Sequence, residues 1–185
     1  MRIVYLGTPS DAVPALQALV ASGNDVALVI TQPDRRRGRG SELTPSPVKQ
    51  AAEELGLTVA TPEKPNEIIS DLRGIGAEVG VVVAYGEILS DEVLASTSSG
   101  FINIHFSLLP RWRGAAPVER AMLAGDAETG VQVMEVVSAL DAGGIYASER
   151  TPIGVTETAG DLRERLVALG AALVVKTLPH VPTTT

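Results

Sequence analysis

Two polar residues that could act together in catalysis, Asn103 and His105, flank one isoleucine in the stretch FINIH (101–105). If this stretch is a strand, alternation places both side chains on one face and Ile104 on the other. An amide donor beside an imidazole can stabilise a developing oxyanion, and the imidazole can also carry a proton near neutral pH. The same two side chains could instead cap backbone groups of a nearby loop, and the residues alone leave both interpretations open.

A carboxylate that could complete this pair is Asp141, which stands among small residues and glycines in SALDAGG. On such a loop an aspartate can orient an imidazole, or accept a proton through a water molecule. An ordinary turn aspartate is the commoner occurrence at such a place, so position alone favours a structural role.

The pattern of apolar and polar residues predicts the elements that would position these side chains. The expected strands are 2–7, 25–31, 79–83 and 101–105, and the expected helices are 9–20, 47–55 and one after Ser90, with Thr8, Ser46 and Ser90 as N-caps. Two further strands, 130–136 and 145–153, are close enough in the chain to pair antiparallel, and a helix should follow at 161–178.

This alternation predicts an α/β fold: a Rossmann-like, open, mostly parallel twisted sheet with helices on both faces and an antiparallel edge. A chain of 185 residues has room for one such domain. Open α/β sheets bind ligands in the loops at the carboxyl ends of their strands. Three loops qualify, namely GTPSD after the first strand, AYGEIL after the valine-rich strand and FSLLPRWRGAAP after His105.

Composition excludes several kinds of site. The chain has no cysteine and only two histidines, His105 and His180, which argues against disulfides, thiolate chemistry and a zinc site. The dinucleotide fingerprint G-x-G-x-x-G, a phosphate loop and a G-x-S-x-G elbow are all missing, which disfavours NAD binding, nucleotide hydrolysis and serine esterase chemistry. We expect a cytoplasmic protein without a membrane segment, because no leader and no apolar run of transmembrane length stands in the sequence.

Charge is unevenly distributed along the chain, whose formal net charge is −7. The segment 31–49 is net +3, which leaves −10 elsewhere; its basic residues are Arg35, Arg36, Arg37, Arg39 and Lys49, and its acidic residues are Asp34 and Glu42. Taken alone, such a cluster is more often a solvated surface than a binding site for a polyanion.

Several long motifs resemble a known family. INIHFSLLPRWRGAAPVERAMLAGD resembles the signature of the folate-dependent formyltransferases, and LDAGGIY resembles their later aspartate loop. GTPSDAVPAL, TQPDRRRGRG with LTPSPVK, VVVAYGEIL and GDAETGV look like the members that act on methionyl-tRNA, and the resemblance runs from Met1 to about Leu178.

This resemblance implies transfer of the formyl group of 10-formyltetrahydrofolate to the α-amino group of methionyl initiator tRNA, without a metal. The family's catalytic asparagine, histidine and aspartate fall on Asn103, His105 and Asp141. The implied folate-binding residues are Tyr85, Gly86, Ser107, Leu108, Leu109, Pro110 and Asp141, and the implied tRNA-binding residues are Arg35, Arg36, Arg37 and Arg39.

The resemblance also implies a domain organisation. Residues 1–178 correspond to the formyltransferase catalytic domain and 179–185 to the start of a linker, whereas the C-terminal β-barrel domain of family members has no counterpart in these 185 residues. We expect a monomer. The alternatives are a formyltransferase for a small amine, such as glycinamide ribonucleotide or an amino-sugar nucleotide, a formyl-folate hydrolase, and a folate-binding module without catalysis.

Overall fold

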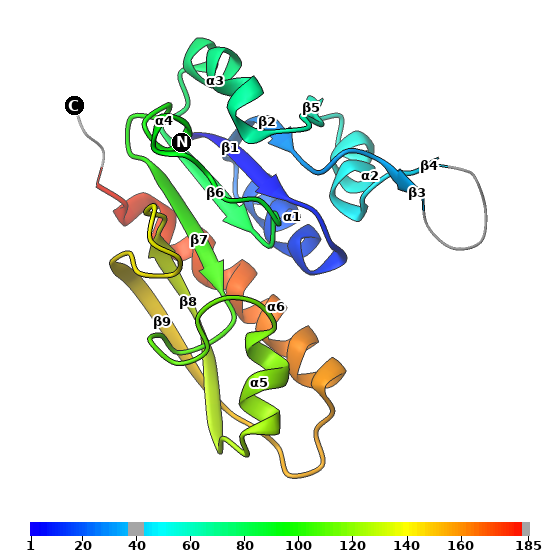
Figure 1. Ribbon diagram of the computed structural model, residues 1–185, viewed down its shortest axis with the longest axis vertical. Helices are drawn as coiled ribbons and strands as arrows, with labels where there is room; N and C mark the ends of the chain where they lie inside the picture. Colours follow the sequence, from blue (N-terminus) through cyan, green and yellow to red (C-terminus); the bar gives the residue numbers. More distant parts are fainter. Residues whose placement is uncertain (37–42, 183–185) are drawn as a thin grey trace.

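The computed structural model describes residues 1–36 and 43–182, and its centre is a seven-stranded sheet in the order β5-β2-β1-β6-β7-β8-β9 (Figure 1). The parallel strands are β1 (Arg2–Gly7), β2 (Asp25–Ile30), β5 (Val59–Ala60), β6 (Val79–Val83) and β7 (Phe101–His105). The remaining two strands, β8 (Glu128–Glu135) and β9 (Ile145–Pro152), pair antiparallel at one edge. The predicted open, mostly parallel sheet with an antiparallel edge is therefore confirmed.

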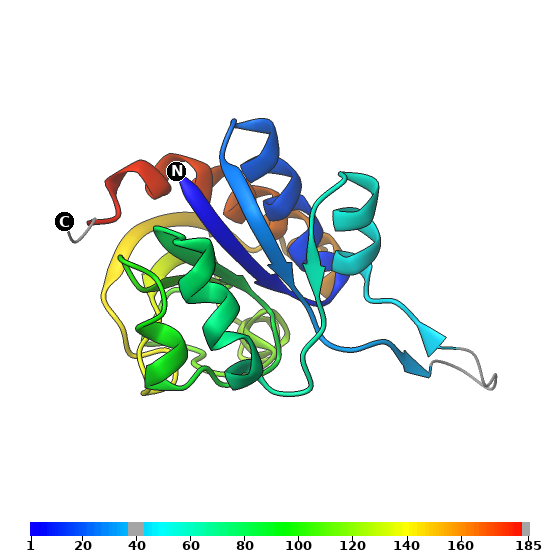
Figure 2. The same cartoon turned by 90° about the horizontal axis from the view of Figure 1, so that it is seen from above.

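Helices cover both faces of the sheet, as predicted (Figure 2). One face carries α1 (Val13–Ala21), α2 (Pro47–Glu54) and α6 (Ala159–Thr177), and the other carries α3 (Ile69–Ile75) and α4 (Asp91–Leu94). A further helix, α5 (Pro117–Leu123), packs against α6, and the 3₁₀ turns are η1 (Ser10–Ala12), η2 (Pro65–Ile68) and η3 (Leu178–His180). Across the described ranges 1–36 and 43–182, no helix combines the length and apolarity that crossing a membrane requires.

The side chains on both faces of the central strands are apolar because each strand contributes to two hydrophobic cores. In β1, Ile3 and Tyr5 pack in the core under α1 and α6, whereas Val4 and Leu6 pack in the core under α3. The near-continuous apolar sequence of β1 and β6 is thus the expected signature of a parallel strand covered by helices on both faces.

The long helix α6 packs against β7. It begins at Ala159, two residues before the predicted start, because the Thr158 hydroxyl caps the Asp161 N–H and the Asp161 carboxylate accepts the Thr158 N–H. At Gly170 the helix comes so close to the sheet that an added Cβ would lie 2.9 Å from the Ile104 side chain. A side chain at position 170 would clash with Ile104, so the close packing of α6 against β7 requires glycine.

The predicted start of the first helix is wrong. Pro9 is extended (φ −78°, ψ 174°), η1 follows, and α1 begins only at Val13. Thr8 is not a cap, because its hydroxyl donates a hydrogen bond of 2.8 Å to the Tyr85 carbonyl. The predicted caps Ser46 and Ser90 are confirmed, since each accepts a backbone N–H in the first turn of its helix. Two helices, α3 and α5, were not predicted.

Gly80 in β6 provides a test of how tightly β6 and β7 pack. It pairs with Phe101, which is 1% exposed, and an added Cβ would lie 2.1 Å from Cδ1 of the Phe101 ring. We expect Gly80→Ala to lower the free energy of unfolding by about 1–3 kcal/mol, as overpacking of a core does. Urea denaturation of the purified chain measures this.

The matched control for Gly80 is Gly74→Ala in α3, where nothing lies within 4 Å of an added Cβ. Alanine is favoured over glycine inside a helix by about 0.5–1 kcal/mol, so the control variant should be as stable as the wild type or more so. If both variants unfold at the same urea concentration, the assigned contact between Gly80 and Phe101 is wrong.

Candidate active site

A cavity of about 610 Å³ opens where the carboxyl ends of β6 and β7 meet the loops after β7 and β8. This is the edge at which open α/β sheets hold ligands. Its polar lining includes Asn103, His105 and Asp141, and its apolar lining includes Val82, Leu89, Ile104, Met134, Val136, Val137 and Leu140. The structure thus brings the asparagine, histidine and aspartate chosen from the sequence to one cavity.

His105 is the last residue of β7 and is 6% exposed. Its Nε2 lies 3.1 Å from the Trp112 carbonyl oxygen. Because a carbonyl only accepts, Nε2 carries a hydrogen and donates it. The other ring nitrogen, Nδ1, lies 3.8 Å from Oδ2 of Asp141. Nδ1 is therefore the ring nitrogen that faces the carboxylate.

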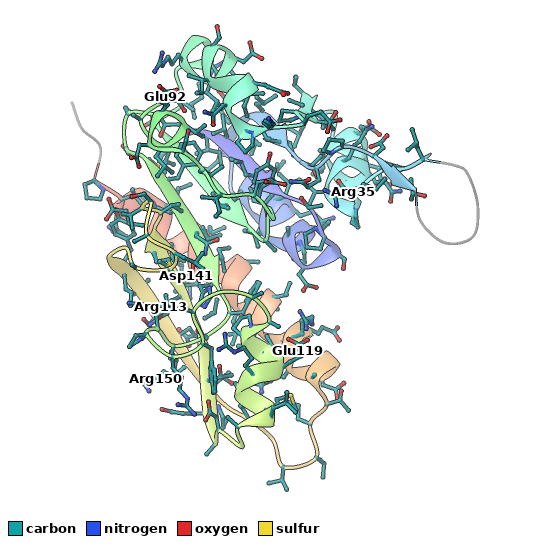
Figure 3. All side chains as sticks on the ribbon, in the orientation of Figure 1. Arg35, Glu92, Arg113, Glu119, Asp141 and Arg150 are labelled. Atoms are coloured by element: carbon teal, nitrogen blue, oxygen red, sulfur yellow. The ribbon has the colours of Figure 1, made fainter. Side chains whose placement is uncertain are left out.

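Asp141 stands on the loop between β8 and β9, near the end of β7 and the loop that carries Arg113 (Figure 3). Its backbone is left-handed (φ 46°), and its Oδ2 accepts a hydrogen bond of 2.7 Å from the Gly114 N–H. The carboxylate is therefore held in place by the loop that follows β7, and His105 and Asp141 each contact that loop.

Asn103 lies two residues before His105 on the same face of β7, as strand alternation predicts. Ile102 and Ile104 belong to the core under α1 and α6, whereas Phe101 belongs to the core on the other side. The core under α1 and α6 thus holds β7 through its isoleucines, and the Asn103 amide is left half-buried in the cavity wall.

Tyr85 and Gly86, which the family resemblance assigned to folate, line the cavity. The Thr8 hydroxyl holds the Tyr85 carbonyl, and Ala84 and Gly86 on either side have positive φ angles of 47° and 94°. Burial raises the pKa of the Tyr85 phenol to about 12, with a smaller contribution from the nearby Glu87 and Glu67 carboxylates. This segment presents a fixed backbone to the cavity.

The other residues that the resemblance assigned to folate, Ser107, Leu108, Leu109 and Pro110, are not among those that line the cavity. The Ser107 hydroxyl donates to the Arg111 carbonyl (2.7 Å), and the Leu109 N–H donates to Oε1 of Gln132 (2.7 Å). In this structure the four residues shape the loop, and the loop contributes Phe106, Gly114, Ala115 and Ala116 to the cavity wall.

Sequence reasoning missed Arg163, which reaches the cavity from α6. Its guanidinium pairs with Asp11 in η1 (3.1 Å) and with Glu119 in α5. Asp11 also lines the cavity, so this bridge ties three separate elements together at the rim. Helical periodicity could not single out Arg163, because an arginine on a helix is ordinarily a surface residue.

Backbone strain gathers around the site. The four non-glycine residues with positive φ in the described part of the chain are Ala84, Trp112, Ala116 and Asp141. Three of them line the cavity, and the fourth, Trp112, presents its carbonyl to His105. Such conformations persist only where the surroundings hold them, and they cluster at functional sites.

The basic segment begins next to the cavity. The ribbon of β3 (Arg35–Arg36) and β4 (Leu43–Thr44) projects from the body of the protein (Figure 1). Exposed Arg35 donates to Gln32 Oε1 (2.9 Å), and a second cavity of about 300 Å³ beside Arg35 shares Ala84, Tyr85 and Gly86 with the first. Lys49 is paired with Asp34 (2.7 Å). The predicted tRNA residues Arg37 and Arg39 lie outside the described residues.

A sheet of this topology, with an amide, an imidazole and a carboxylate in a cavity at its carboxyl edge, defines a Rossmann-like α/β protein with a candidate acid–base site. Within 1–36 and 43–182 no group of three or more metal-ligating side chains could hold a metal ion. Residues 1–178 match the family described as formyl transferase, and the chain belongs to this family. The family predicted from the sequence motifs is thereby confirmed.

Relatives of known name are similar over nearly the whole chain. It is 52% identical to methionyl-tRNA formyltransferase of Roseobacter denitrificans over 96% of this chain and 59% of that protein. It is likewise 52% identical to methionyl-tRNA formyltransferase of Moorella thermoacetica, over 96% of this chain and 58% of that protein. The chain therefore spans about three-fifths of the length of these relatives.

Solved structures share the fold. Phosphoribosylglycinamide formyltransferase from Bacillus halodurans superposes with a TM-score of 0.80 at 24% identity, covering 96% of this chain and 93% of that chain. A sugar 3N-formyl transferase superposes with a TM-score of 0.74 at 21% identity, covering 98% of this chain and 62% of that chain. At such identities the likeness establishes the Rossmann-like fold alone.

Proposed function

We propose that this chain transfers the formyl group of 10-formyltetrahydrofolate to the α-amino group of methionine esterified to initiator tRNA. The observation that carries the proposal is the meeting of Asn103, His105 and Asp141 at one cavity, with His105 Nδ1 3.8 Å from the carboxylate. The relatives named methionyl-tRNA formyltransferase, at about 52% identity, favour this acceptor. We further propose that the reaction takes place in the cytoplasm.

The cavity suits a folate. Its volume of about 610 Å³ lies within the usual range for small-molecule sites, and its walls are mainly apolar with some polar groups. The backbone at Tyr85 and Gly86 would bind the flat ring system, with the apolar residues around Val137 and Leu140 packing against it. When bound, the folate supplies an activated formyl carbon on nitrogen.

Asn103 and His105 would stabilise the negative charge that develops on the formyl oxygen when the amine attacks. The Nε2–H of His105 is already bound to the Trp112 carbonyl, so the protonated imidazole would donate through Nδ1. Fixed donors of this kind contribute roughly 10²–10³ in rate each. Asp141 would stabilise the imidazolium from 3.8 Å away.

Asp141 would also move the proton. The attacking amine must lose a proton and the departing folate nitrogen must gain one. A carboxylate 3.8 Å from Nδ1 is beyond direct hydrogen bonding, so one bridging water or a small loop closure completes the relay. No covalent intermediate on the protein is needed, and the chain indeed has no cysteine.

An assay of formyl transfer from 10-formyltetrahydrofolate tests the proposal. The purified chain is given charged methionyl initiator tRNA, glycinamide ribonucleotide, an amino-sugar nucleotide, or no acceptor. Formylation of methionyl-tRNA with a kcat/KM well above that of the small amines supports the proposal. Preference for a small amine assigns that acceptor instead, and consumption of the donor without acceptor assigns a hydrolase.

We expect the chain to bind initiator tRNA weakly and with strong dependence on salt. The motivation is a +3 segment on a body of −10, which attracts a polyanion locally and repels it overall. Contacts of arginine with phosphate weaken steeply as salt rises. Titration of charged initiator tRNA at two salt concentrations measures this for the wild type and for Arg39→Ala.

The matched control is Arg73→Ala, which removes an exposed arginine of α3 outside the basic segment. Arg39→Ala should weaken binding severalfold and flatten the salt dependence, and Arg73→Ala should change neither. Tight binding that ignores salt, or equal effects of the two substitutions, would contradict a tRNA contact by the Arg35–Arg39 segment.

A further inference from the structure

The side chain of Trp112, whose carbonyl contacts His105, is held from several directions. Its indole Nε1–H donates a hydrogen bond of 2.7 Å to Oδ2 of Asp126. The guanidinium carbons of Arg111 and Arg120 lie 4.3 and 5.2 Å from the centre of its ring, within the range of cation–π attraction. The ring therefore has little freedom to turn, although it stands on a loop.

Asp126 is the residue that gathers these contacts. It follows α5, and its own N–H donates to the Ala121 carbonyl, which anchors it to that helix. Arg111 binds it with two parallel hydrogen bonds, Nε to Oδ2 at 2.9 Å and Nη2 to Oδ1 at 2.7 Å. The hydrogen bonds from Arg111 and Trp112 hold the pKa of Asp126 below its usual range. One carboxylate thus grips two successive residues of the loop after β7.

The backbone conformation of Trp112 is one that surrounding contacts must hold in place. Its φ of 65° is in the left-handed region, which is unfavourable for a bulky side chain. In this conformation the Trp112 carbonyl meets Nε2 of His105 at 3.1 Å. Two residues further on, the Gly114 N–H meets Oδ2 of Asp141 at 2.7 Å. The same strained turn therefore orients both titratable groups of the candidate site.

We propose that Asp126 is a positioning residue, which holds Trp112 so that the Trp112 carbonyl keeps His105 in the Nε2–H tautomer and leaves Nδ1 facing Asp141. The effect on tautomer follows from the contacts alone, whereas the effect on turnover rests on the proposed function. When one ring nitrogen of a histidine is bound by a carbonyl, the other becomes the site of proton exchange. Without the Asp126 contacts, the Trp112 carbonyl would move away from Nε2 of His105. Both tautomers of neutral His105 would then become populated.

The imidazole nitrogens report this directly. In the full chain labelled with ¹⁵N-histidine, we expect the His105 nitrogen shifts of the neutral ring to be those of an Nε2–H tautomer. In Asp126→Ala they should move toward a mixture with the Nδ1–H tautomer. Trp112 is the single tryptophan of the chain, so its one indole N–H resonance reports the bond to Asp126 in the same samples.

Matched variants distinguish loss of the contact between Asp126 and Trp112 from a general loss of structure. Trp112→Phe removes the indole N–H and keeps an aromatic ring, so it should shift the His105 tautomer as Asp126→Ala does, and the double variant should add little. Asp126→Asn keeps an oxygen that accepts from the indole and should restore the wild-type tautomer. Glu128, two residues after Asp126, forms an exposed ion pair with Arg150 (2.6 Å), and Glu128→Ala should leave the tautomer unchanged.

In the formyl-transfer assay, Asp126→Ala should lower kcat about 10- to 100-fold, the usual cost of losing a group that orients a functional side chain, with KM nearly unchanged. A wild-type tautomer in both folded Asp126→Ala and folded Trp112→Phe overturns the proposal. A shifted tautomer in these variants supports it even if the wild type formylates none of the acceptors tested, and that second result would reject the proposed function alone.

Discussion

Replacing His105 by alanine is expected to lower the kcat of formyl transfer by about a thousandfold or more. The imidazole would donate to the developing oxyanion and pass on a proton, and these contributions are worth roughly 10²–10³ and 10²–10⁴ in rate. KM should change much less, because both contributions act on the transition state. Asn103→Ala, which removes one donor, should cost about 10²–10³ in kcat.

The variant should still fold, because the core under α1 and α6 holds β7 through Ile102 and Ile104. The matched control is His180→Ala, which removes the chain's other histidine at an exposed position in η3. Steady-state kinetics with 10-formyltetrahydrofolate and methionyl-tRNA measure the effect, and circular dichroism confirms folding. Near-normal kcat in a folded His105→Ala chain would remove His105 from the proposed chemistry.

Asp141→Asn is expected to lower kcat by about 10²–10⁴, the contribution of a positioned general acid–base group. The substitution isolates the charge. Asparagine tolerates the left-handed conformation that Asp141 adopts (φ 46°), and its side-chain oxygen can still accept the Gly114 N–H. The loop should therefore stay in place while the carboxylate that accepts the proton is lost.

The dependence of kcat on pH distinguishes proton transfer by Asp141 from a structural role. If Asp141 relays the proton, the pH profile of kcat should change in Asp141→Asn, along with the loss of most of the rate. Asp71→Asn, which alters an exposed aspartate of α3 away from the cavity lining, is the control and should keep the wild-type profile. A wild-type pH profile in Asp141→Asn would mean that Asp141 only shapes the loop.

Local sequence was sufficient wherever the pattern acts over a few residues. The cap at Ser46 is followed by Pro47, and in the structure its hydroxyl accepts the Lys49 N–H at 3.0 Å. The alternation in 101–105 placed Asn103 and His105 on one face, as observed. The predicted strands 130–136 and 145–153 pair antiparallel within β8 and β9.

Local sequence failed where a distant contact outweighs a local preference. Thr8 before Pro9 is a common helix start, yet the Tyr85 carbonyl takes the Thr8 hydroxyl and the helix begins later. The resemblance assigned Ser107, Leu108, Leu109 and Pro110 to the folate; these residues do not line the cavity, and their role in folate binding stays a prediction.

By itself, then, the sequence determined the fold class, the family and the residues that carry candidate chemistry, because hydrophobic periodicity and ordered motifs can be read along the chain. Only the tertiary structure decided which nitrogen of His105 faces Asp141, which residue holds Trp112 in its strained conformation, and that Arg163 reaches the rim of the cavity. Each of these depends on distances between segments far apart in the chain. Folding creates those distances when the helices and sheet pack, and no local pattern encodes them.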